Sequence, residues 1–265
     1  MRRVILITSD EVRHIFFSKF IASSNKYETV KTYVESHKKN DVSNELKNEH
    51  LLLREQTERD FFDLFNNRIN DSSNPKYIEK GQINSAKIVD EIIFLNPDLI
   101  ISYGCSIIKS SLLLKFKGRF INIHLGLSPY YRGSGTNFFP FVNNEPEYVG
   151  ATFMYIDEGI DTGEIIHQIR PTISLGDNIH HIGNRLIKEM AIVCEKLIIN
   201  FNQLKIIHSL SFNLQNEKYY RKKDFTEDTV KQMYLNFQNN MINEYLNNKL
   251  ERDKKVPMIQ NPILL

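Results

Sequence analysis

The sequence predicts an α/β fold in which a mostly parallel β-sheet is flanked by helices. Short apolar runs such as Val4–Thr8 have the length and composition of buried strands, and amphipathic segments of helical spacing lie between them. The two kinds of segment alternate along most of the chain, which is typical of this fold class. The chain has 265 residues, 41% of them hydrophobic, enough for one large domain or one domain with a small appendage.

The first half of the chain supplies most of the expected sheet. A buried strand at Val4–Thr8 precedes a helix from about Glu11 to Ala22, for which Ser9 or Asp10 is a suitable N-cap. This order of strands and helices predicts a Rossmann-like arrangement. The next expected elements are a strand at 26–34, a helix in the second half of 35–58, a loop at 67–81, a helix at 84–96, a strand at 99–101, a short helix at 106–116 and a strand at 119–125.

The second half of the chain has a different pattern. Residues 149–157 and 164–171 look like two antiparallel strands joined by a turn. A long helix follows at about 178–200, with Asp177 as its cap.

The tail changes character near Phe212. We expect a strand or hairpin arm at 217–225 and then one helix over 226–248 with Thr226 as its cap. The sequence therefore predicts a catalytic domain over residues 1–205 and a C-terminal strand and helix appendage over residues 206–265. The appendage is expected to serve oligomerisation or substrate contact.

Composition excludes several classes of protein. The 34 basic and 32 acidic residues nearly balance, so charge alone does not indicate a nucleic-acid partner. Cys105 and Cys194 cannot make a disulfide framework or an all-cysteine zinc site. The apolar stretch Val4–Ile7 is too short for a signal peptide, and no apolar run approaches membrane-spanning length. We expect a soluble, cytoplasmic protein without a membrane partner.

The strand expected at 119–125 carries two polar side chains. Because side chains alternate between the faces of a strand, Asn122 and His124 share one face, and Ile121 and Ile123 share the other. Ligands of open α/β sheets bind at the carboxyl ends of strands. An amide and an imidazole there could donate hydrogen bonds to a developing oxyanion. On the pattern alone, a buried polar pair that fixes the strand end explains the two residues equally well.

The turn between the two antiparallel strands is rich in acids and glycines. Gly159 and Gly163 permit a tight backbone near a ligand, and Asp157 and Asp161 lie four residues apart. A carboxylate beside an imidazole favours the imidazolium and can relay protons. Taken alone, the stretch is better explained as an ordinary acidic turn.

The segment at 128–140 is a candidate substrate loop. Tyr130, Tyr131 and Arg132 precede Gly133 and Gly135, and the arginine would suit a phosphate or carboxylate. A surface loop with its aromatic side chains packed down explains the pattern at least as well.

Other residues give weaker signals. His14, His180 and His181 lie on a helix or at a helix start, where capped or solvated roles are expected rather than metal binding. Cys105 is expected to be a buried or loop thiol. The first strand ends in "ITSDEV" without glycine, so it lacks the glycine-rich loop that binds a phosphate. We also expect no metal site.

Three motifs together resemble the folate-dependent formyltransferase family. They are "NIH" at 122–124, "PYYRG" at 129–133 and "DEGIDTG" at 157–163, in the order and spacing of that family. The resemblance covers roughly residues 90–190. It implies N10-formyltetrahydrofolate as the cosubstrate, no metal, and a catalytic set of Asn122, His124 and Asp161.

The resemblance also implies the binding residues. The family's pterin pocket is lined by backbone of the stretches that match "SYGCSII" and "IDEGID". The loop that matches "PYYRG" is expected to contact the acceptor substrate. The implied cofactor residues are Tyr103, Gly104, Ile107, Asp157 and Glu158, and the implied substrate residues are Tyr130, Tyr131, Arg132 and Gly133.

Departures from the family pattern reduce the number of family branches that the resemblance implies. Many members follow the histidine with Pro-Ser-Leu-Leu-Pro, whereas here Leu-Gly-Leu-Ser-Pro follows, so the contacts of that loop differ. The missing glycine-rich loop argues against glycinamide ribonucleotide as substrate, and the short tail after Phe212 argues against the tRNA enzymes. The remaining branch is that of the nucleotide-sugar N-formyltransferases.

The resemblance thus implies an N-formyltransferase that acts on an amino (dideoxy) sugar linked to a nucleotide, by family analogy for a surface polysaccharide. Its partner is a small-molecule substrate. A homodimer through the C-terminal helix or hairpin is compatible with the sequence, which does not itself indicate one. Two alternatives stay open: a hydrolase of formyltetrahydrofolate, and a non-catalytic nucleotide-binding or interaction module.

Overall fold

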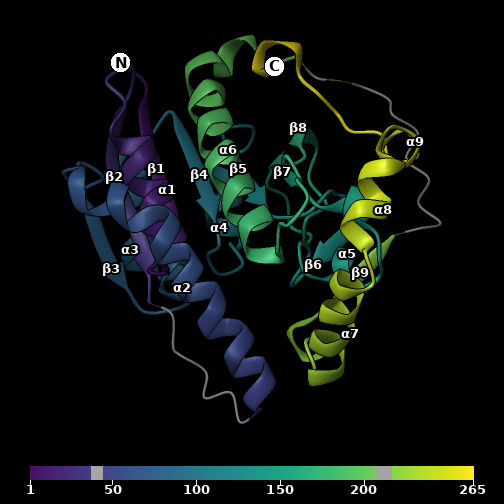
Figure 1. Cartoon of the computed structure of the whole chain (residues 1–265). Coiled ribbons are helices and arrows are strands. Elements are labelled where there is room, and N and C mark those ends of the chain that lie inside the picture. The colour runs from purple at the N-terminus through teal and green to yellow at the C-terminus, as the bar shows by residue number, and fades with distance from the viewer. Residues whose placement is uncertain (37–43, 206, 208–216) are drawn as a thin grey trace.

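The computed structural model of the chain describes residues 1–36, 44–205, 207 and 217–265 (Figure 1). Its main sheet has the strand order β3-β2-β1-β4-β5-β7-β8. Neighbouring strands from β3 to β5 pair in parallel, whereas β7 is antiparallel to both β5 and β8. The strands are β1 (Arg3–Ser9), β2 (Glu28–Glu35), β3 (Pro75–Ile78), β4 (Leu99–Tyr103), β5 (Phe120–His124), β7 (Ala151–Tyr155) and β8 (Ile165–Ile169). The prediction of a mostly parallel α/β sheet is confirmed.

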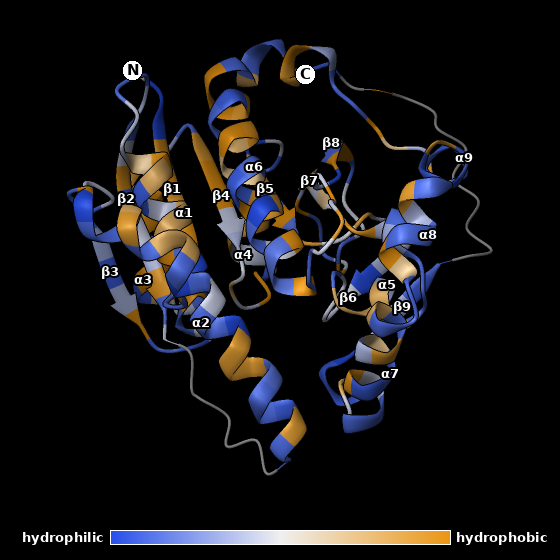
Figure 2. Ribbon diagram, in the orientation of Figure 1, coloured by the Kyte–Doolittle hydropathy of each residue, from blue (hydrophilic) through white to orange (hydrophobic). Residues whose placement is uncertain are grey.

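Helices cover both faces of the sheet. Figure 1 shows α1 (Val12–Ala22), α2 (Glu45–Arg68) and α6 (Ile179–Asn200) close together over one face. Residues of α3 (Ala86–Leu95) and α4 (Ser110–Lys115) pack on the other face. Hydrophobic residues follow β1, β4 and one side of α6, as Figure 2 shows. The central strands are therefore buried between two apolar layers.

The two layers define two cores. The larger core lies under α1, α2 and α6 and includes Leu6, Ile101 and Phe153. The smaller core lies under α3 and α4 and includes Ile7 and Phe120. The core to which a strand residue belongs therefore identifies the face of the sheet on which its side chain lies.

The C-terminal part of the chain packs against the rest of the fold rather than standing apart. β9 (Lys218–Tyr220) pairs in parallel with β6 (Tyr131–Gly133), and buried residues of α7 (Glu227–Gln238) and α8 (Met241–Asn247) join the larger core. The remaining helices are α5 (Phe139–Val142) and α9 (Lys249–Lys254). The predicted change of character near Phe212 and the boundary at residue 206 lie outside the described residues, so the division into two domains stays a prediction.

Several local expectations need correction. α1 begins after Glu11 without a side-chain cap, and neither Ser9 nor Asp10 is its N-cap. α6 is capped by Asn178, whose side chain accepts from two backbone N–H groups at 2.9 Å. Asp177, the expected cap, instead accepts hydrogen bonds from the Arg185 guanidinium. The Asp177 carboxylate also accepts from the Ser174 N–H at 2.7 Å, so it binds the preceding turn and Arg185 rather than the first turn of α6.

Three further elements differ from the expectation. β3 lies within the stretch predicted as a loop, and α2 continues to Arg68. The helix predicted from Thr226 does begin there, with Thr226 accepting from a backbone N–H, but it ends at Gln238. Asn240 has a φ of 71°, in the left-handed region, and separates α7 from α8.

Candidate active site

The polar pair on β5 lies on one face of the strand, as period-two alternation predicts. Ile121 and Ile123 enter the larger core, whereas Phe120 enters the smaller one. Asn122 and His124 are on the same side as Phe120. His124 is 7% exposed, so its imidazole is almost fully enclosed by protein.

A serine on the neighbouring strand orients the Asn122 amide. Ser102 of β4 lies directly beside Asn122 in the parallel ladder, and its Oγ donates to Asn122 Oδ1 at 3.0 Å. Because the amide oxygen faces Ser102, the amide nitrogen points away from β4. Asn122 Nδ2 lies 3.4 Å from Asp161 Oδ1. The amide therefore presents hydrogen-bond donors, rather than its oxygen, to the loop above it.

Asp161 reaches the pair from the loop that joins β7 to β8. This loop turns back over the face of β5, because the Ile156 N–H donates to the Phe120 carbonyl at 3.0 Å. Asp161 itself has a φ of 53°, a left-handed conformation that aspartate tolerates better than most residues. Its Oδ2 lies 3.3 Å from His124 Nδ1 and accepts from the Gly133 N–H at 3.1 Å.

Both ring nitrogens of His124 face acceptor oxygens. Nδ1 faces the Asp161 carboxylate, and Nε2 lies 3.1 Å from the Tyr131 carbonyl oxygen. A doubly protonated imidazole can donate to both acceptors, whereas a neutral imidazole can donate to only one. The arrangement therefore provides hydrogen-bond partners for an imidazolium, the form that stabilises negative charge.

The absence of a side chain at Gly126 leaves room for the His124 imidazole. A Cβ atom at this position would lie 2.7 Å from His124 Nε2 and 2.7 Å from the Cβ of Thr136. Both contacts are far shorter than a van der Waals separation, and Thr136 is held by its own hydrogen bond to the Leu125 carbonyl. The departure of the sequence after the histidine thus has a steric role: a side chain there would displace the ring.

These contacts bring an amide, an imidazole and a carboxylate together on one face of β5. A protein-family model described as Formyl transferase matches residues 18–196, which is most of the chain. The chain belongs to the formyl transferase family.

Curated relatives are similar to this formyl transferase over part of their length. The methionyl-tRNA formyltransferase of Finegoldia magna is 34% identical over 91 residues, which are 34% of this chain and 29% of that protein. That of Clostridioides difficile is 38% identical over 95 residues, 35% of this chain and 29% of that protein. In both cases the match spans less than a third of the relative.

Solved structures share the fold over most of the chain. A sugar N-formyltransferase from a Shewanella species has a TM-score of 0.57 at 21% identity, covering 88% of this chain and 87% of that chain. Glycinamide ribonucleotide transformylase 1 from Symbiobacterium toebii has a TM-score of 0.55 at 16% identity, covering 77% and 88%. At these identities the likeness establishes the fold alone.

The predicted substrate loop of this formyl transferase is ordered by its own packing. Tyr130 and Tyr131 are buried in the larger core, and Tyr131–Gly133 forms β6. Arg132 forms an ion pair with Glu217 and donates to the Ile160 carbonyl at 3.3 Å. The burial of the two tyrosine rings agrees with the alternative of a surface loop whose aromatic side chains pack down, because these rings are apolar over most of their surface. Substrate contact by these residues stays a prediction.

The residues predicted for the pterin pocket have different surroundings. The Tyr103 ring is buried against Phe17 and His14, so only its backbone faces the sheet edge. Gly104 has a φ of 70°, and a Cβ there would lie 2.3 Å from His14 Nε2. Ile107 is 68% exposed. The stretch 103–107 therefore presents backbone groups and one exposed apolar side chain, that of Ile107.

In the acidic loop between β7 and β8, the Asp157 side chain stabilises the turn. Its carboxylate accepts from the Thr162 hydroxyl at 2.8 Å and from the Gly159 N–H at 3.0 Å. Glu158 is exposed. The explanation as an ordinary acidic turn thus applies to Asp157, whereas Asp161 in the same loop faces Asn122 and His124.

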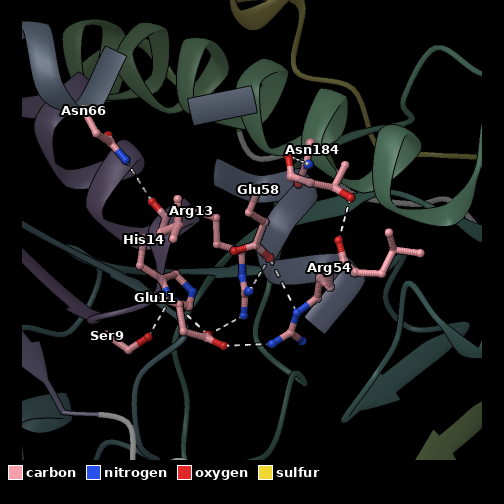
Figure 3. A network of polar contacts seen from close by, with 11 residues as sticks. Ser9, Glu11, Arg13, His14, Arg54, Glu58, Asn66 and Asn184 are labelled. Atoms are coloured by element: carbon pink, nitrogen blue, oxygen red, sulfur yellow. Dashed lines mark hydrogen bonds and ion pairs between the residues drawn. The ribbon is translucent and has the colours of Figure 1, made fainter. Parts of the chain in front are cut away.

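A buried polar network at the start of α1 is absent from the predicted site residues (Figure 3). Glu11 forms ion pairs with Arg13 and Arg54, and Arg13 and Arg54 both reach Glu58 of α2. Burial alone lowers the pKa of Arg13, but Glu58 and Glu11 beside it raise that pKa above its ordinary value. The i,i+4 spacing of Arg54 and Glu58 was the local signal available in the sequence.

Two predictions about weaker candidates can now be checked. His14 and His180 are buried rather than solvated: His14 lies against Ser9 and Glu11, and His180 lies beside His50. Burial raises the pKa of the Cys105 thiol to about 12, so this cysteine is unreactive at neutral pH.

Two searches covered the part of the chain that the structure describes. No group of histidine, cysteine and acidic side chains in it could hold a metal ion. None of its helices has the length and apolar character needed to cross a membrane.

Proposed function

We propose that this formyl transferase moves the formyl group of N10-formyltetrahydrofolate to the amine of a nucleotide-linked amino sugar. The observation that carries the proposal is the convergence of Asn122, His124 and Asp161. Their side chains lie within 3.4 Å of one another through the Asp161 carboxylate, although the aspartate is remote in sequence.

The donors are placed for a reaction at a carbonyl group. Asn122 Nδ2 carries two hydrogens, and Asp161 takes one of them. The second is available to the oxygen that gains negative charge when an amine attacks a formyl carbon. One such donor typically contributes about 3–4 kcal/mol to lowering the barrier. Bound N10-formyltetrahydrofolate supplies the formyl group.

His124 and Asp161 act as a pair in this scheme. The carboxylate holds the imidazole through Nδ1, and the N–H on Nε2 is the donor that an oxyanion can take over from the Tyr131 carbonyl. Asp161 keeps the imidazolium in place and helps to move the proton released by the amine to N10 of the folate, whose bond to the formyl carbon breaks as the new carbon–nitrogen bond is completed. Positioning of two bound reactants supplies the rest of the acceleration.

Each segment assigned to the pterin pocket exposes one isoleucine. Ile107 is 68% exposed on the first segment, and Ile160 is 41% exposed on the second. Ile108 and Phe120 belong to the smaller core and Cys105 packs against it, so the first segment lies on the same face of the sheet as the catalytic set. Backbone groups of the stretch that begins at Gly104 would hold the ring edge, and the two isoleucines would cover its faces.

The segment after β1 supports a nucleotide-sugar acceptor over a ribonucleotide monophosphate. It holds Glu11, whose carboxylate pairs with Arg13 and Arg54, so these arginines are already paired with a carboxylate (Figure 3). It also lacks the glycines whose backbone N–H groups would bind a phosphate at this position. This supports the assignment to the sugar branch of the family.

The decisive experiment is a panel of acceptors with N10-formyltetrahydrofolate, read by mass spectrometry for the added formyl group. The panel contains UDP-, dTDP- and GDP-linked amino sugars, together with glycinamide ribonucleotide and methionyl-tRNA. We expect formylation of one or more nucleotide sugars only. Formylation of methionyl-tRNA alone, or release of formate without any amine, would replace the proposal by a tRNA enzyme or a hydrolase.

A further inference from the structure

β6 rests on a strand from the C-terminal segment. The Lys218 N–H donates to the Tyr130 carbonyl at 2.7 Å, and the Ser134 N–H donates to the Tyr220 carbonyl at 2.8 Å. These hydrogen bonds flank the parallel pairing of β6 with β9 (Lys218–Tyr220). One backbone edge of β6 is therefore occupied by β9.

The other edge of β6 holds the catalytic pair. The Tyr131 carbonyl faces His124 Nε2 at 3.1 Å, and the Gly133 N–H donates to Asp161 Oδ2 at 3.1 Å. Backbone groups of successive strand residues point to alternate edges, so these contacts lie opposite those made with β9. β6 is also closely seated, because a Cβ on Gly133 would lie 2.2 Å from the Tyr220 carbonyl oxygen.

Side chains clamp β6 to β9. The Lys218 ammonium donates to the two carboxylate oxygens of Glu145 at 2.7 and 2.5 Å, and the Tyr131 hydroxyl donates to the same carboxylate. The Asn143 amide donates to the hydroxyls of Tyr131 at 2.7 Å and of Tyr220 at 2.9 Å. The ring of Tyr131, whose carbonyl contacts His124, is therefore fixed by residues of the C-terminal segment and of the 143–145 turn.

We propose that β9, acting through β6, positions His124 and Asp161 for formyl transfer, with Lys218 as the main positioning residue. The inference rests on the proposed function. β9 lies outside residues 18–196, the part of the chain that matches the family. The C-terminal segment thus contributes to catalysis without supplying a group to the reaction, in addition to any role in assembly.

The test compares Lys218→Met with Lys249→Met. Lys249 ion-pairs with Asp253, which accepts from the Tyr245 hydroxyl at 3.0 Å, so it belongs to the same kind of lysine–carboxylate–tyrosine set elsewhere in the C-terminal segment. We expect Lys218→Met to lower kcat about 10- to 100-fold while KM for the amine stays within about two-fold, since misplacement affects the reacting geometry more than binding. Lys218→Arg should restore most of kcat, and Lys249→Met should leave it unchanged.

A second readout does not depend on turnover. NMR of the imidazole nitrogens in histidine-labelled protein, with His124→Gln for assignment, reports the environment of Nε2 directly. We expect this resonance to move in Lys218→Met and to stay in Lys249→Met. If it moves while the wild-type protein formylates no amine, the positioning stands and the proposed function is wrong. If Nε2 and kcat are unchanged in Lys218→Met, or both lysine variants lose kcat equally, the inference is overturned.

A milder variant covers the case in which Lys218→Met does not fold. Tyr220→Phe removes only the hydroxyl that Asn143 contacts and keeps the ring stacked on Phe139, at 3.7 Å between centroids. A smaller displacement of the same Nε2 resonance is then expected, and an unchanged resonance overturns the inference.

Discussion

Each polar group of the candidate site has its direction fixed by a second group. Ser102 fixes which end of the Asn122 amide faces the loop, and Asp161 and the Tyr131 carbonyl fix the imidazole of His124. Donors held in place before the reaction need not reorganise when charge develops, which is the main reason that such groups accelerate carbonyl chemistry.

Removal of any one of these side chains should therefore cost activity more than stability. We expect Asn122→Ala to lower kcat about 10²–10³-fold, the usual loss for one oxyanion donor. His124→Ala and Asp161→Ala should fold and lose transfer, as measured by steady-state kinetics beside a thermal melt. Near-normal kcat in the His124 or Asp161 variant would show that the roles are assigned wrongly.

Gly126 offers a steric test of the same ring. A methyl group in Gly126→Ala would overlap His124 Nε2 and Thr136, so we expect kcat to fall although no reacting group is removed. Gly183→Ala is the matched control, because a Cβ there meets nothing within 4 Å and lies within α6. The control should raise the free energy of unfolding by about 0.8–1.0 kcal/mol, the helix preference for alanine over glycine. Equal kcat in the wild type and Gly126→Ala contradicts the steric role.

At the scale of elements, the junction of α2 with the start of α6 contains buried histidines. Burial, reinforced by Arg54, lowers the pKa of His50 to about 4, and burial with His50 as neighbour lowers that of His180 to about 3. An unfolded histidine titrates near about 6.5. Below that pH the unfolded chain binds more protons than the folded one, so stability must fall as the pH drops toward 4.

Urea unfolding at about pH 7.5 and about pH 5 measures this dependence. We expect a lower midpoint at the acidic pH, and a smaller difference in His180→Phe, which removes one of the groups that must stay neutral. The exposed neighbour His181 provides the control, since His181→Phe should leave the difference unchanged. A difference that persists fully in His180→Phe would assign the pH dependence to other groups.

Elements whose signals are local could be predicted, and those decided by distant partners could not. The alternation on β5 and the cap of α7 depend on neighbours in sequence, and both are confirmed. β3 was missed because it is a short, partly exposed edge strand that begins with a proline. Asp177 and Asn178 can each cap a helix, and in the folded chain Asp177 instead binds Arg185 and the Ser174 N–H, whereas Asn178 caps α6.

The residues of the candidate site were likewise predictable only in part. The sequence motifs identify Asn122, His124 and Asp161 as a set, because the resemblance joins residues that spacing alone does not. The groups that support this set could not be found from the sequence motifs. Glu145 and Lys218 belong to no motif and contact each other only in the folded chain. The network of Arg13 and Glu58 was missed for the same reason.

At the scale of the whole molecule, the sheet and the C-terminal helices share one core. Val230, Met233, Met241, Ile242 and Tyr245 are all buried in the larger core. Burial of one such side chain contributes about 1.5–3 kcal/mol, and a domain has about 5–15 kcal/mol of net stability.

A chain that ends at residue 205 should therefore lose cooperative thermal unfolding rather than yield a folded catalytic domain. Circular dichroism during a thermal melt measures this. Leu250→Ala, at a side chain 89% exposed, is the control that should leave the melt unchanged. A truncated chain that melts cooperatively would restore the picture of a separable appendage.

The pairing of β6 with β9 has a consequence for the order of folding. Tyr131 and Lys218 are 87 residues apart, so their contact closes a long loop and forms slowly relative to the helices and to the short-range pairing of β7 with β8. During refolding, far-ultraviolet circular dichroism should begin to recover before enzymatic activity, because β6, which contacts the imidazole and carboxylate, is held only after β9 has docked on it. The same delay applies during synthesis, when residues 218–220 leave the ribosome long after Asn122, His124 and Asp161.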